Sequence, residues 1–191
     1  MIELRRLFCS DDSYFRMSQV WDWLVGDDEE NVDGYETTTV KWYKTQTRDP
    51  VKDSAGVVAF DGRSTLVAPE WMREEAENGG MFANFTLAHE FAHLALDHHA
   101  RGAVVKNFQL FSGEFGNANI PPTVEELEAN YAAVFFQCGV ALLDPNIEAT
   151  ELAKRASSDD YLVKKLKKMC ALEIFQTELS ALNGRVERVI L

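Results

Sequence analysis

The sequence contains few cysteines, and they form no motif. Three occur in the 191 residues, Cys9, Cys138 and Cys170, and they lie far apart in the chain. The lack of a C-x-x-C pair argues against a thiolate zinc site and against a dithiol redox centre. An odd number of widely separated cysteines is more typical of a reducing compartment than of a disulfide-bonded secreted protein.

Long apolar stretches are also missing. No run approaches the about 20 apolar residues that a membrane-spanning helix needs. Residues 1–6 lack the apolar core of a signal peptide. Together with the cysteines, this predicts a cytoplasmic protein without a membrane-embedded part.

Positive charge is scarce relative to negative charge. The chain has 19 Lys and Arg residues against 31 Asp and Glu residues, a formal net charge of −12. Such a chain would repel phosphates, so direct nucleic-acid binding is not expected. Acidic residues are dense between positions 22 and 36. We interpret this segment as a solvated loop, and the alternative is a docking patch for a basic partner.

Periodicity and turn residues predict mostly helices, with strands only in the first half. The expected elements are a helix over 14–25, a strand over 37–45, a hairpin over 56–69 turning at Asp61-Gly62, a short helix over 70–78, a helix over 82–99 stopped near Gly102, a long loop over 103–122, and helices over 123–143, 147–155 and 159–181 with a turn at Ser157-Ser158.

This order of elements indicates an α+β fold in a single domain over residues 1–191. Residues 1–50 form a variable N-terminal part with a helix, the acidic loop and a strand. Residues 51–143 contain the hairpin, expected as part of a small antiparallel sheet, and the two motif helices. Residues 144–191 contain the C-terminal helices.

The central feature is a His-Glu-x-x-His motif inside an apolar run with helical periodicity. On a helix, His89 and His93 lie on one face, where two imidazoles can bind one metal ion. Glu90 follows the first histidine, where its carboxylate can reach a metal-bound water. Buried imidazoles and a buried carboxylate need polar partners, and a shared metal supplies them. The motif predicts a site for one Zn²⁺, with Glu90 as the catalytic residue.

Catalytic zinc usually has three protein ligands and one open position, so a third ligand is needed. His99 has the spacing found in metzincins, but Leu96 stands where those proteins have glycine. A continuous helix would carry His99 too far along its axis to share the ion. Asp97 shares the face of His93, but one straight helix does not wrap three ligands around an ion. Its expected role is a hydrogen bond to His93 or contact with solvent.

The next helix offers three carboxylates, Glu125, Glu126 and Glu128. Glu126 shares a face with small residues, which let two helices approach closely, and with Asn130, which can orient a histidine. The local alternative is a capping box between Thr123 and Glu126, which would use this carboxylate. We predict Glu126 as the third ligand, Glu128 as the next candidate, and Glu125 in solvent.

These two segments resemble the ImmA/IrrE metallopeptidases. Residues 84–96 (N-F-T-L-A-H-E-F-A-H-L-A-L), followed by residues 126–133 (E-L-E-A-N-Y-A-A), are similar to the family pattern F-T-L-A-H-E-x-G-H and E-x-E-A-N-x-F-A-A. Ala92 stands where the family usually has glycine. The hairpin and a helix-turn-helix-like pair over 151–166 resemble further parts of the family, whereas residues 1–50 match nothing in it.

The resemblance implies a zincin-like fold and a gluzincin-like site, with His89, His93 and Glu126 on zinc and Glu90 as the base. It also implies a zinc-dependent endopeptidase whose protein substrate is a separate transcriptional repressor. Its cleavage would relieve repression of mobile-element or stress-response genes. We expect an extended substrate to pair with the hairpin edge at residues 65–68 through backbone hydrogen bonds.

Two other functions are considered. The chain could be a zinc-containing module that controls a partner regulator without proteolysis, but a purely structural zinc site needs no base, and Glu90 is present. It could also bind DNA through the lysines of the helix over 159–181. The negative net charge argues against this, and we interpret those lysines as a solvated basic face.

Overall fold

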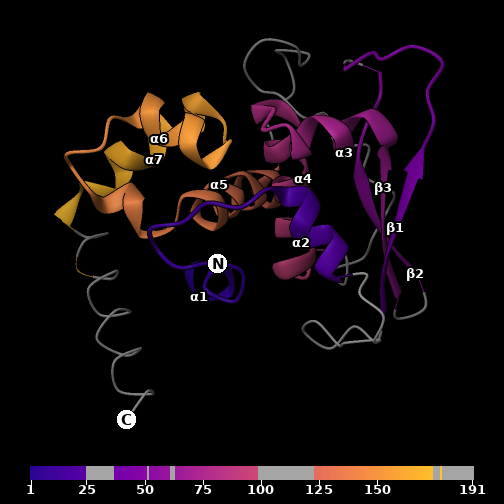
Figure 1. The fold of residues 1–191 in the computed structure, drawn as a ribbon. Coiled ribbons are helices and arrows are strands. Elements are labelled where there is room, and N and C mark those ends of the chain that lie inside the picture. Colours follow the sequence, from indigo (N-terminus) through magenta and orange to yellow (C-terminus); the bar gives the residue numbers. More distant parts are fainter. Residues whose placement is uncertain (25–36, 51, 61–62, 99–122, 174–176, 178–191) are drawn as a thin grey trace.

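The computed structural model describes residues 1–24, 37–50, 52–60, 63–98, 123–173 and 177. They form an α+β architecture in which a three-stranded sheet lies beside a group of helices (Figure 1). The strands are β1 (Thr37–Tyr43), β2 (Gly56–Phe60) and β3 (Arg63–Pro69). The helices are α1 (Ile2–Arg5), α2 (Met17–Leu24), α3 (Glu70–Glu77), α4 (Met81–Ala95), α5 (Val124–Cys138), the 3₁₀-helix η1 (Gly139–Leu143), α6 (Ala149–Ala156) and α7 (Asp160–Cys170).

Some predicted features lie outside the described residues. They are most of the acidic segment, the hairpin turn at Asp61-Gly62, His99 and Gly102, the long loop over 103–122, and residues 174–176 and 178–181 of the last predicted helix. Within the described part of the chain, none of the helices combines the length and the apolar character that a membrane crossing requires.

The sheet has the order β1-β3-β2, with β3 in the centre. The hairpin forms as predicted, and Val57 of β2 pairs with Leu66 of antiparallel β3. β1 runs parallel to β3, with Val40 opposite Leu66, so the sheet is mixed and the prediction of an antiparallel sheet was wrong. Residues 65–68 were also wrongly predicted as a substrate-binding edge, because neighbouring strands pair with both sides of β3.

The other predicted elements are present with shifted ends. The first predicted helix corresponds to α2, which starts at Met17, and α1 was not predicted. The helix expected over 123–143 is broken at Gly139, which has φ +57°, so that η1 follows α5. α6, its turn at Ser157 and the start of α7 agree with the sequence pattern, but α7 ends at Cys170.

The motif helix α4 ends at Ala95 rather than at residue 99. Asp97 takes a left-handed conformation with φ +56°, its N–H donates to the carbonyl of Leu94, and the N–H of His98 donates to the carbonyl of His93. These two bonds form a Schellman motif, the usual way in which a helix ends with a left-handed residue. Glycine is the common residue at this position, and aspartate tolerates it better than most residues do.

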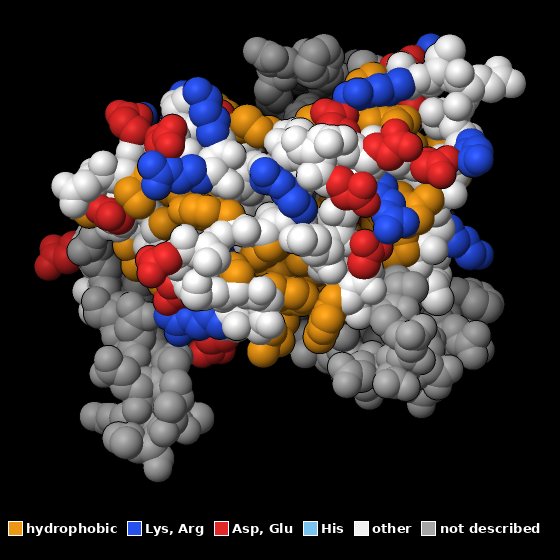
Figure 2. Space-filling model, in the orientation of Figure 1, with side chains coloured by type: hydrophobic (Ala, Val, Ile, Leu, Met, Phe, Trp, Pro, Cys, Tyr) orange, Lys and Arg blue, Asp and Glu red, His pale blue; other side chains and the backbone are white. Residues whose placement is uncertain are grey.

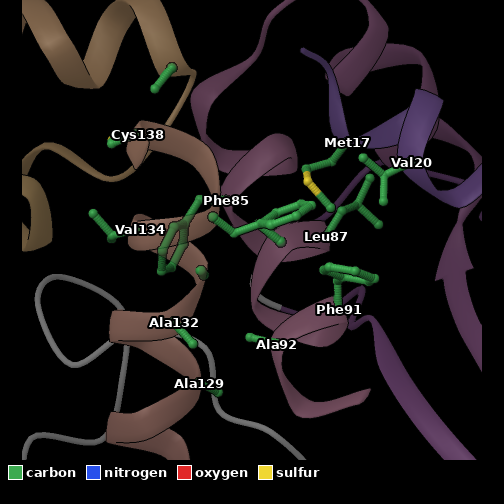
Figure 3. Packing of buried hydrophobic residues seen from close by; sticks show 14 of the residues in the cluster. Met17, Val20, Phe85, Leu87, Phe91, Ala92, Ala129, Ala132, Val134 and Cys138 are labelled. Atoms are coloured by element: carbon green, nitrogen blue, oxygen red, sulfur yellow. The ribbon is translucent and has the colours of Figure 1, made fainter. Parts of the chain in front are cut away.

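α4 lies at the centre of the core, between α2, α3, β2 and α5. Phe91 is fully buried and contacts Trp21 of α2 and Phe136 of α5 edge-on or tilted. Trp21 donates its indole N–H to the carbonyl of Leu87. Figure 3 shows Met17 and Val20 on one side of α4 and the small residues of α5 on the other. Burial on nearly every side agrees with the apolar character of this helix.

Charged side chains of both signs are mixed on the surface over α3 and over α6 and α7 (Figure 2). In α7, Lys164 forms an ion pair with Asp160, and Lys167 donates to the carbonyl of Asp144. The cysteines Cys138 and Cys170 are buried. The lysines of α7 are therefore partly engaged within the molecule.

Candidate metal centre

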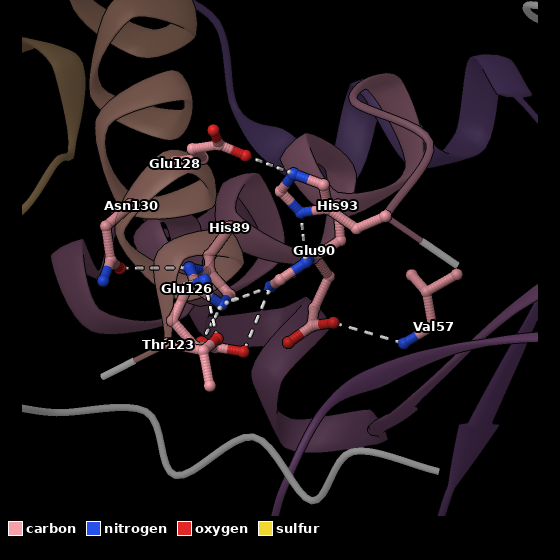
Figure 4. A network of polar contacts seen from close by, with 9 residues as sticks. Val57, His89, Glu90, His93, Thr123, Glu126, Glu128 and Asn130 are labelled. Carbon is pink, nitrogen blue, oxygen red and sulfur yellow. Dashed lines mark hydrogen bonds and ion pairs between the residues drawn. The ribbon is translucent and has the colours of Figure 1, made fainter. Parts of the chain in front are cut away.

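α4 presents the two motif histidines to α5 (Figure 4). Their side chains are almost fully buried, and the Nε2 atoms of His89 and His93 lie 3.0 Å apart. The separation follows from the helix, since residues four apart are neighbours on one face. Glu90 is also fully buried, but it points toward the sheet, where its Oε2 accepts the N–H of Val57 at 3.2 Å.

α5 brings Glu126 to the two histidines. One carboxylate oxygen lies 3.2 Å from Nε2 of His89, and the other lies 3.6 Å from Nε2 of His93. His89, His93 and Glu126 form the one group among the described residues whose His, Cys, Asp or Glu ligand atoms converge closely enough to bind a metal. α4 and α5 approach closely here because small side chains separate them, Ala92 on α4 and Ala129 on α5 (Figure 3).

The Glu126 carboxylate does not form the capping box that the sequence offers as an alternative. Thr123 caps α5, because its hydroxyl accepts the N–H of Glu126 at 3.3 Å. The Glu126 carboxylate, which would complete a capping box by turning back, instead reaches His89 and His93. One residue thus has its backbone N–H capped by Thr123 while its side chain faces α4.

Each histidine has a second contact on the far side of its ring. Oδ1 of Asn130 lies 3.0 Å from Nδ1 of His89, which confirms the predicted orienting contact. Nδ1 of His93 lies 2.9 Å from Nδ1 of His98. With hydrogen bonds at both Nδ1 atoms, both Nε2 atoms are left to face Glu126. Partners of this kind select the ring tautomer of metal-binding histidines.

The remaining candidates occupy other positions. Glu128 does not reach the three-residue group, and its carboxylate lies 3.1 Å from Nε2 of His98. Glu125 belongs to no ligand group among the described residues. Asp97 is the left-handed residue that ends α4. His98 was not predicted as part of the site, because the helix was expected to continue through this position.

The electrostatics differ between the two carboxylates. Burial opposes ionisation of Glu126, but hydrogen bonds with His89 and His93 outweigh it and lower the pKa of Glu126 to about 2. Burial raises the pKa of Glu90 to about 7, and the nearby Glu126 adds to the rise. Glu126 is therefore suited to act as an anionic metal ligand, and Glu90 is suited to exchange a proton near neutral pH.

The residues fit a zinc ion. Ligands at the usual zinc distances in a tetrahedron lie about 3.3 Å from one another, and the three separations here are 3.0, 3.2 and 3.6 Å. Two imidazole nitrogens and one carboxylate leave one tetrahedral position open, the composition of a catalytic site. Glu90 Oε1 is buried and has no hydrogen-bond partner among the described residues, so Glu90 keeps one oxygen available beside the ligands.

The buried Glu90 is expected to lower the stability of the metal-free protein near neutral pH. Its pKa rises from 4.5 to about 7 on folding. The folded chain then binds more protons than the unfolded chain between these values, so the free energy of unfolding falls as the pH rises through them. In urea unfolding with a chelator, Glu90→Gln should be more stable than the parent protein by up to about 3 kcal/mol at about pH 8. The difference should nearly vanish at about pH 4.5. Equal stabilities at the higher pH would contradict this description of Glu90.

No protein-family model, curated protein or solved structure matches this chain in comparisons with known proteins. Its function is therefore inferred from the chemistry of the three converging side chains and of Glu90.

Proposed function

We propose that this chain is a zinc-dependent endopeptidase with a zincin-like, ImmA/IrrE-type site. The observation that supports this most directly is the convergence of His89, His93 and Glu126 beside Glu90. A structural zinc site needs only its ligands. This site also contains the buried carboxylate of Glu90, which takes no part in the contacts among the three ligands. The three free cysteines of the chain fit a reducing compartment, so we propose that the reaction takes place in the cytoplasm.

In this proposal His89, His93 and Glu126 hold the zinc. When bound, zinc lowers the pKa of a coordinated water toward neutrality and polarises a nearby carbonyl group. The close approach of α4 and α5 keeps the ligands together, and Asn130 holds the ring of His89 in the orientation that presents Nε2.

Glu90 moves the proton. Its carboxylate accepts a proton from the water that attacks the scissile carbonyl carbon, while the new C–O bond forms. When the C–N bond breaks, Glu90 returns this proton to the leaving amine, so the products are a carboxylic acid and an amine. The hydrogen bond from the Val57 N–H to Oε2 fixes the side chain and leaves Oε1 for the proton transfer.

We propose that the substrate binds along the edge strand β2. The Val57 N–H points away from β3 toward Glu90. Because backbone N–H and C=O groups alternate in direction along a strand, the backbone groups of Ala59 point to the same edge of β2. An extended peptide that adds to this edge would pass beside Glu90. Binding of this kind uses main-chain hydrogen bonds for affinity and side-chain pockets for specificity.

The proposed substrate class is a separate transcriptional repressor, whose cleavage would relieve repression in a mobile-element or stress-response setting. The resemblance of the two motif segments to ImmA/IrrE proteins supports this part. The negative net charge of the chain supports a protein substrate more than a nucleic acid.

Metal removal provides the direct test. The purified chain is incubated with candidate repressor proteins from the same genome, with and without EDTA, and the products are identified by mass spectrometry. We expect cleavage at one or a few peptide bonds, loss of at least about 100-fold in rate with the chelator, and recovery when zinc is restored.

Cleavage that continues at the same rate in metal-free protein would contradict the proposal. Zinc-dependent binding of the repressor without any cleavage would instead support the alternative, a zinc-containing module that controls its partner without proteolysis.

A further inference from the structure

The end of α4 places a third histidine against the site. The Schellman motif at residues 93–98 reverses the chain after Ala95, with Asp97 as its left-handed residue. This reversal carries His98 back over the last helical turn. The rings of His93 and His98 lie with their centroids 4.9 Å apart and an angle of 69° between their planes. His98 is buried, at 5% exposure.

His98 connects His93 to a carboxylate on the other helix. Its Nδ1 lies 2.9 Å from Nδ1 of His93, and its Nε2 lies 3.1 Å from a carboxylate oxygen of Glu128. Glu128 lies two residues after Glu126 on α5, and about half of its side chain is exposed. Two residues of α5 therefore contact the histidines of α4, one directly at the ligand group and one through His98.

When His98 is neutral and Glu128 is ionised, these contacts fit one assignment of protons. An ionised carboxylate only accepts hydrogen bonds, so His98 donates from Nε2 to Glu128. A neutral His98 then accepts at Nδ1, and the donor must be Nδ1–H of His93. This leaves the Nε2 lone pair of His93 facing His89 and Glu126, the state in which it can bind a metal.

The two ligand histidines are thus supported in different ways. His89 has a neutral amide oxygen, that of Asn130, behind its Nδ1. His93 has a second imidazole, which is itself bonded to an anion. Hydrogen bonding to a carboxylate raises the basicity of a ligand histidine and fixes its tautomer and orientation.

We propose that His98 and Glu128 are positioning residues for His93, and that Glu128 acts on the metal site only through His98. This inference depends on the proposed role of His89, His93 and Glu126 as metal ligands. It predicts that the affinity for a metal ion depends on two residues that do not bind the ion.

The test uses Co²⁺ as a spectroscopic probe and competition with Zn²⁺ for affinity, both in the full chain. In His98→Leu the acceptor at Nδ1 of His93 is lost, and we expect affinity to fall by about 10–100-fold with a changed cobalt absorption spectrum. His98→Asn offers an amide oxygen in the same region, as Asn130 does for His89, and should recover much of the affinity. Glu74→Gln, an exposed charge change on α3, should have no effect.

A double-mutant cycle separates positioning from general charge effects. Glu128→Gln should weaken binding in the parent protein but cause no further loss in His98→Leu, because the residues act in series. Glu128 is exposed enough that its replacement should not prevent folding. An undiminished effect of Glu128→Gln in His98→Leu would overturn the inference, as would parent-like affinity and spectrum in His98→Leu. If the parent protein itself binds neither metal, the proposed metal site fails, and this outcome is distinct from the other two.

Discussion

Replacing Glu90 by glutamine is expected to slow peptide cleavage by at least about 100-fold, within the about 10²–10⁴-fold range of general acid–base catalysis. Glutamine has nearly the same shape, and its amide oxygen can still accept the N–H of Val57. It cannot take a proton from water and return it to the leaving amine. The variant should therefore bind substrate and zinc normally and yet fail at the chemical step.

Two measurements on Glu90→Gln distinguish lost chemistry from lost structure. Zinc content by mass spectrometry should remain one ion per chain, and the cleavage rate of the repressor should drop while its binding is kept. Glu74→Gln, an exposed glutamate of α3, is the matched control and should cleave at the parent rate. If Glu90→Gln keeps full activity, Glu90 is not the proton carrier and the mechanism is wrong.

Removing the Glu126 side chain is expected to have the largest effect on metal binding. Glu126→Ala leaves two ligands, both on α4, and loses the anionic one. The zinc affinity should therefore fall by more than about 100-fold, which is the largest loss expected for residues that orient a ligand without binding the metal. Glu128→Ala acts through His98 and should stay within about 10–100-fold or less. Isothermal titration with zinc and a competing chelator measures both changes.

The order of these two effects distinguishes the two carboxylates that the sequence leaves as candidates. If Glu128→Ala loses zinc and Glu126→Ala keeps it, the ligand assignment is wrong and His98 becomes a candidate ligand. Equal and small losses in both variants would indicate that neither carboxylate completes the site.

The motif half of the site could be predicted from local spacing alone. A helix places His89 and His93 on one face wherever it forms, and the apolar residues around them predict burial. Glu126 was harder to predict, because Thr123 gave its carboxylate a local alternative. In the structure this carboxylate faces the two buried imidazoles, and Thr123 caps only the backbone N–H of Glu126.

The features that were predicted wrongly depend on non-local geometry. Nothing in the β1 sequence specifies its pairing direction, because β3 offers an edge to either a parallel or an antiparallel neighbour. The end of α4 carries no glycine, and Asp97 adopts the left-handed conformation in its place. The predicted helix continued past Ala95, where α4 ends, and for that reason His98 was overlooked. Residues near a helix end can be placed only when its last turn is known.

The central claim is that His89, His93 and Glu126 bind one zinc ion. Anomalous diffraction at the zinc absorption edge, from crystals of the zinc-loaded full chain, tests it most directly. We expect a single strong peak within about 2.0–2.2 Å of Nε2 of each histidine and of a Glu126 oxygen. A peak between His98 and Glu128, or no peak at these side chains in crystals of protein saturated with zinc, would contradict the account.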